Sequence, residues 1–214
     1  MIRDISISAI PKQEKHRDFN LQTHFVADLY LRFFTEVKCG NFEKISIRLF
    51  NNKPSTKVFE LDKVIMLDLE EDISSFFSMN DIERKFWILK KIYDSILFLS
   101  KTYPIDEKKI RQAYKKCLTL EVNNQYSHGE IQYSNGHSYS GLIICRHLSS
   151  SFIIEVHIFD QKGIKINCIQ LVETAPYWTE FEEYLGEVKS NDEEIILYGR
   201  DKKRKIGCKF KNDE

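Results

Sequence analysis

The pattern of hydrophobic and polar positions is clearest from Asn80 to Ser100, where it predicts a helix. Apolar side chains recur there at alternating steps of four and three, at Ile82, Phe86, Leu89, Tyr93 and Ile96. This spacing gathers them on one stripe of a helix. Others widen the stripe, namely Trp87, Ile88, Ile92, Leu97 and Leu99. Asn80 and Glu83 have the spacing of a capping box, so we predict a core helix that begins there.

The residues before this helix predict strands. Ile5, Ile7 and Ala9 alternate with polar residues until Pro11, which is typical of a half-buried strand. The stretch 21–39 fits both a strand and a helix, because its apolar residues match period 2 and period 3.6 equally well. We favour a strand, since β-branched and aromatic residues dominate it and alternation resumes directly after Gly40. With a further strand over 61–69, the first half is predicted to be an antiparallel β-meander.

A second helix and a second set of strands follow. Pro104 breaks the chain, and a helix is predicted to end at about Leu118. Asn135-Gly136 suits a type I′ hairpin turn. Three further strands are predicted over 142–146, 152–159 and 164–171. A bulged turn with Gly163 in the left-handed region would place the following residues opposite each other: Ile158 and Ile164, Val156 and Ile166, Ile154 and Cys168.

The last part predicts a short helix and a hairpin. The helix spans 174–185 and ends at Gly186, and the apolar residues of the hairpin are Ile195, Leu197, Ile206, Cys208 and Phe210. The order predicts an α+β protein, with two antiparallel strand-rich halves flanking a central pair of helices. Without a repeat or a flexible linker, we expect a single domain over 1–214, with a possible internal division near 101–121.

Charge and cysteine usage narrow the classes of function. The 32 basic residues balance the 32 acidic residues, so no global field favours nucleic acid or an anionic membrane. The N-terminal residues lack the apolar core of a signal peptide, and no apolar run approaches the ~18 residues that span a bilayer. The 5 cysteines are scattered and never form a C-x-x-C pair, which argues against disulfides and zinc knuckles. We therefore expect a cytoplasmic protein without a cofactor.

Two alternatives to protein binding come from local clusters. Glu155 and His157 share one face of a strand, and an adjacent strand could bring His147 beside them to serve a metal-assisted hydrolase. The spacing matches no known ligand motif, and His157 would face Lys165, so we assign no metal or catalytic residue. The second predicted helix carries a basic face, Lys108, Lys109, Arg111, Lys115 and Lys116. It could contact phosphates, but the balanced charge favours a solvated face.

Polar and aromatic residues instead favour a non-enzymatic protein-binding module. The predicted hairpin from Asn123 to Gly141 carries aromatic and imidazole side chains with few aliphatic neighbours, including Tyr126, Tyr133, His137 and Tyr139. This composition suits protein recognition. The short helix adds an acidic surface for a basic partner, Glu180, Glu182, Glu183 and Glu187. By analogy alone, such a module could be an inhibitor of the bacterial toxin-immunity kind, which occludes a toxin's active site. The oligomeric state stays open.

Overall fold

The computed structural model describes residues 1–10, 14–51, 56–134, 138–191 and 193–210. The chain forms two compact units, Met1–Asn124 and Gln125–Glu214, and each has its own hydrophobic core. Helices and sheets are both present, so the predicted α+β class is confirmed. The expectation that 1–214 folds as a single domain stays a prediction.

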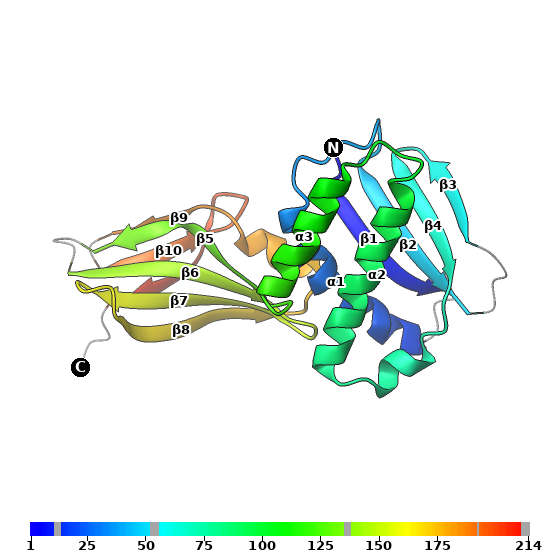
Figure 1. Ribbon diagram of the computed structural model, residues 1–214. Helices are drawn as coiled ribbons and strands as arrows, with labels where there is room; N and C mark the ends of the chain where they lie inside the picture. Colours follow the sequence, from blue (N-terminus) through cyan, green and yellow to red (C-terminus); the bar gives the residue numbers. More distant parts are fainter. Residues whose placement is uncertain (11–13, 52–55, 135–137, 192, 211–214) are drawn as a thin grey trace. The chain divides into compact units, whose positions relative to one another are not determined.

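The N-terminal unit combines a four-stranded sheet with three α-helices (Figure 1). Its elements are β1 (Asp4–Ile10), α1 (Glu14–Phe33), β2 (Lys44–Phe50), β3 (Lys57–Leu61), β4 (Val64–Glu70), the 3-10 helix η1 (Ser74–Ser78), α2 (Asp81–Leu99) and α3 (Glu107–Thr119). The strand order is β1-β2-β4-β3. β2 pairs in parallel with β1 and β4, and only β3 pairs antiparallel, with β4. The predicted antiparallel meander is therefore wrong for this half, because α1 is a crossover between two parallel strands.

The preference for a strand over 21–39 is also wrong, since most of this stretch belongs to α1. The buried residues of α1 follow the helical period: Phe19, Thr23, Val26, Leu29 and Tyr30 are all almost fully buried. They join a core that α2, α3 and the sheet complete. Burial of this stripe outweighs the β-propensity of the individual residues, which depends on context.

The helix α2 begins as predicted, but its buried stripe is rotated. The capping box is confirmed, because the Asn80 side chain accepts from the Glu83 N–H and the Glu83 carboxylate accepts from the Asn80 N–H. Ile82 and Phe86 are exposed, whereas the core side is formed by Ile88, Leu89, Ile92, Ile96 and Leu99. The second predicted helix is confirmed as α3, which Asp106 caps.

The C-terminal unit is built from two sheets with a core between them. Its elements are β5 (Asn124–Tyr133), β6 (Tyr139–His147), β7 (Phe152–Asp160), β8 (Lys165–Thr174), α4 (Trp178–Phe181), the 3-10 helix η3 (Glu182–Tyr184), β9 (Val188–Ser190), β10 (Glu194–Tyr198) and β11 (Arg204–Lys209). The sheet orders are β5-β6-β7-β8 and β11-β10-β9. Ile143, Val156 and Leu197 belong to their shared core. A Cβ added at Gly141 would lie 1.9 Å from Ile195 Cδ1, so glycine permits this close approach.

Of two hairpins in this unit with a predicted strand pairing, one agrees with the prediction and the other does not. In the last hairpin, Ile195 pairs with Cys208 and Leu197 with Ile206, which agrees with the apolar residues predicted there. Gly163 does have a positive φ of 75°, but the predicted β7 to β8 register is wrong. Phe159 already pairs with Lys165 beside the turn, whereas the predicted register places it opposite Gly163, and irregularities after Ile158 and Ile154 shift the pairing further.

Two other predicted features differ in extent. The predicted Asn135-Gly136 turn and His137 lie outside the described residues, although β5 and β6 are neighbours in the sheet. The short helix is shorter than predicted: β8 continues to Thr174, and α4 begins only at Trp178.

Candidate functional site

The two edge strands of the N-terminal sheet, β1 and β3, differ in whether other groups bond to their outer backbone atoms. The β1 edge is covered by α1. The buried Thr23 hydroxyl donates to the Ile7 carbonyl at 3.0 Å. One turn earlier, Asn20 Oδ1 accepts from the Ala9 N–H at 2.9 Å. These contacts satisfy backbone groups that an edge strand leaves unpaired, so α1 protects β1 from pairing with another strand.

The opposite edge is formed by β3, whose five residues are all exposed. In the described part of the sheet its one strand neighbour is β4. Val58, Phe59 and Leu61 are 38%, 39% and 56% exposed, although they are apolar. We call Lys57–Leu61 the β3 edge surface. An exposed strand of this kind presents backbone donors and acceptors, together with apolar side chains, to another chain.

A tyrosine supports the β3 edge surface on the face that carries the helices. The Tyr103 hydroxyl donates to Glu60 Oε1 at 3.0 Å, and its ring packs edge-to-face on Phe42. Burial and then the negative charge of Glu60 raise the pKa of Tyr103 to about 12. The hydroxyl therefore stays protonated near neutral pH and holds Glu60 in place.

A buried ion pair supports β3 on the other face. Arg48 Nε donates to Asp68 Oδ1 at 2.7 Å, and Asp68 is only 1% exposed. The Arg48 guanidinium also lies over the ring of Phe59, 4.8 Å from its centroid. In the described residues, the core that the helices share with the sheet lies on one face. We call this second face, on which Phe59 and Leu61 are exposed, the open face of the sheet.

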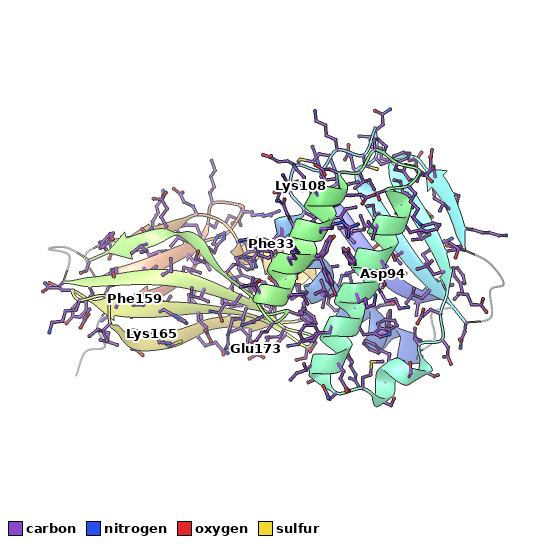
Figure 2. The ribbon with its side chains drawn as sticks, in the orientation of Figure 1. Phe33, Asp94, Lys108, Phe159, Lys165 and Glu173 are labelled. Carbon is purple, nitrogen blue, oxygen red and sulfur yellow. The ribbon has the colours of Figure 1, made fainter. Side chains whose placement is uncertain are left out.

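A second candidate site lies on strands β7 and β8 of the C-terminal unit. In Figure 2, Phe159 and Lys165 mark one end of these two strands and Glu173 marks the other, and the site lies between the two ends. We call Arg146, Glu155, His157 and Cys168 the outer-face cluster. Glu155 Oε2 lies 3.2 Å from His157 Nε2, and Glu155 Oε1 accepts a short hydrogen bond from Arg146. His157 pairs with Cys168 across β7 and β8. The ligand atoms of Glu155, His157 and Cys168 all lie within 4.8 Å of one another.

The structure corrects the membership of this cluster. The sequence predicts His147 beside Glu155 and His157, but it is buried and packs edge-to-face against the rings of Phe152 and Phe181, which stack on each other. Its Nε2 lies 3.1 Å from the Pro176 carbonyl oxygen. His147 pairs with Phe152 at a core position of β7, so strand alternation places it on the opposite face. Cys168 takes its place, and the predicted partner of His157, Lys165, pairs with Phe159 instead.

The cysteine of the cluster is not an activated nucleophile. Burial and then the negative charge of Glu155 raise the pKa of the Cys168 thiol above its ordinary value. A catalytic cysteine needs a lowered pKa to supply thiolate. Cys168 therefore lacks the lowered thiol pKa that covalent catalysis would need.

The predicted partner-binding residues that the structure describes differ in exposure, and their role in binding a partner stays a prediction. Tyr126 and Tyr139 are partly buried against the C-terminal core, whereas Tyr133 is 52% exposed. Among the acidic residues, Glu182 pairs with Arg200 at 3.0 Å and Glu187 with Lys189 at 3.1 Å. Glu180 and Glu183 are exposed. The two ion pairs reduce the negative electrostatic field of this segment. Recognition of a basic partner by these residues stays a prediction.

The basic face of α3 has a structural explanation. Lys109 donates to the carbonyls of Thr35 and Glu36 just after α1, and Arg111 pairs with Glu107. A hollow of about 560 Å³ lies beside them, lined by Arg32, Phe33, Thr35, Gln112, Lys115, Lys116 and Thr119. Its cations lie near the C-terminal ends of α1 and α3, where positive charge offsets the helix dipole.

The chain was compared with protein-family models, curated proteins and solved structures, and none matches it. Among the helices of the described residues, none has the length and apolar character needed to cross a bilayer.

Proposed function

We propose that this chain is a protein-binding module that captures an extended segment of a partner along the β3 edge surface. The observation that carries the proposal is an edge strand whose five residues are all exposed, three of them apolar. Addition of a strand to such an edge gives affinity through main-chain hydrogen bonds and specificity through alternate side chains. This assigns binding to the N-terminal unit, in addition to the aromatic hairpin that the sequence favours.

The partner segment is expected to be extended and apolar on one side. Phe59 and Leu61 project to the open face, because they pair with Met66 and Val64, which alternate with the helix-facing Ile65. Apolar residues at alternate positions of the partner would cover these two side chains. Arg48, already paired with Asp68, would border the contact without an unpaired charge.

A co-purification experiment with matched variants tests the proposal. The tagged full chain is expressed in its native host, beside a double variant with Phe59→Lys and Leu61→Lys and a control with Ile82→Lys. Lysine on an edge strand disfavours pairing, and Ile82 is an exposed apolar residue elsewhere on the same unit, at 67%. We expect a protein retained by wild type and the control and lost from the double variant.

Purified partner then gives the affinity. A loss of at least about tenfold for the double variant, or about 1.4 kcal/mol, with an unchanged control, would support the proposal. Equal affinity for wild type and double variant would overturn it. Loss of binding in Tyr133→Ala alone would assign the contact to the aromatic hairpin instead.

A further inference from the structure

The outer-face cluster brings together three types of metal ligand from two strands. Glu155 and His157 lie two residues apart on β7 and so project from the same face of the strand. Cys168 on β8 pairs directly with His157. A carboxylate, an imidazole and a thiol thus converge without any sequence motif, because the shifted register of β7 and β8 sets the pairing.

We propose that Glu155, His157 and Cys168 form a binding site for Zn²⁺ or a similar transition metal ion, with a fourth position left for water. Zinc binds these three ligand types at about 2.0–2.3 Å, usually in a tetrahedron, so neighbouring ligand atoms lie roughly 3.3–3.8 Å apart. Glu155 and His157 already approach to 3.2 Å. The remaining separations, at most 4.8 Å, close by a small rotation of the Cys168 side chain, which is exposed.

The ligand set selects the class of ion. Calcium and magnesium require six or more oxygen ligands, or several waters with carboxylates, and this site offers a single carboxylate. A thiolate and an imidazole instead suit zinc, cobalt or copper.

Arg146 is suited to position the carboxylate. It donates to Glu155 Oε1, the oxygen that faces away from His157, and so leaves Oε2 directed toward the proposed ion. The Glu155 side chain is 11% exposed and His157 15%, so both have little room to turn. Hydrogen bonds of this kind orient metal ligands, and their removal typically lowers affinity by about 10–100-fold.

Metal binding at this site must release the thiol proton of Cys168, because the thiolate is the ligand. Affinity for the ion is therefore expected to increase with pH.

Cobalt titration of the full chain tests the site. Chelator-treated protein is titrated with Co²⁺, and a cysteine ligand is expected to produce a thiolate-to-cobalt charge-transfer band at one ion per chain. Zn²⁺ should remove the band by competition. Cys168→Ser should abolish the band, and His157→Gln should weaken binding by at least about tenfold.

Gln170→Ala is the matched control, because Gln170 pairs with Glu155 on the same strands but offers no ligand of this class. It should bind as wild type does, and circular dichroism should show all variants folded. Absence of a cobalt band in wild type would overturn the proposal, as would a band that persists in Cys168→Ser. Neither result depends on the β3 edge surface, so this site and the proposed protein binding can fail separately.

Discussion

The two edge strands of the N-terminal sheet, β1 and β3, differ in whether their unpaired backbone groups are covered. At the β1 edge, α1 supplies a hydroxyl and an amide oxygen to backbone groups of Ile7 and Ala9. At the β3 edge, apolar side chains stand exposed beside main-chain groups that have no second strand among the described residues. At the β1 edge the backbone groups are satisfied by α1, whereas the exposed β3 edge is the surface on which the proposed binding depends.

Loss of a buried contact of α1 should have the largest effect on the free energy of unfolding. Phe19 is fully buried and contacts the rings of Phe76 and Trp87 at 4.8 and 6.0 Å between centroids. Phe19→Ala should lower the free energy of unfolding by about 3–5 kcal/mol, because it removes transfer energy and leaves a cavity. Urea denaturation measures this. A loss below about 1 kcal/mol would contradict the assignment of α1 as the element that closes the β1 edge.

Loss of the Thr23 hydrogen bond at the β1 edge should have an intermediate effect on the free energy of unfolding. Thr23→Val removes the hydroxyl that reaches the Ile7 carbonyl, so a buried acceptor loses its partner. We expect a loss of about 1–3 kcal/mol in the free energy of unfolding. Thr23→Ser keeps the hydroxyl and serves as the control, which should retain more stability than the valine variant. Equal stability of the two variants would show that the hydrogen bond does not stabilise this edge.

The β3 edge should show the smallest effect on stability. Leu61→Lys alters an exposed side chain, and we expect the change in the free energy of unfolding to stay within about 0.5 kcal/mol. Phe59→Lys also removes the contact of its ring with the Arg48 guanidinium, so we expect a loss of up to about 1 kcal/mol. Thermal denaturation with Ile82→Lys as the reference measures the difference. A much larger loss would mean that these side chains stabilise the unit itself and would weaken the contrast between the edges.

The sequence predicted those elements best whose signals were local. Asn80 and Glu83 predicted the start of α2, because a capping box depends only on neighbours in the chain. The stretch 21–39 carried both periodicities, and only packing against three other elements decides for a helix. The parallel pairing of β1 with β2 follows from that choice. The parallel pairing of β2 with β4 has another cause, because β3 lies between them in the chain and pairs antiparallel with β4 at the edge.

The candidate sites depended on long-range pairing and were only partly predictable. Glu155 and His157 could be placed together because alternation along one strand is fixed. Cys168 could not, since bulges in the pairing of β7 and β8 set its neighbour. His147 looked equally suitable by sequence, but strand alternation directs it into the core. β3 left a weaker signal, because the apolar residues of Lys57–Leu61 do not alternate and the sequence alone does not place this segment at an edge.

Hydrogen exchange of the backbone amides of β3 tests the central claim most directly. The full chain is compared alone and bound to the partner identified by co-purification, with the amides of β1 as an internal reference. We predict that outward-facing amides within Lys57–Leu61 exchange rapidly in the free chain and become protected in the complex, while β1 is unchanged. Rapid exchange of the β3 amides in a saturated complex would contradict the account.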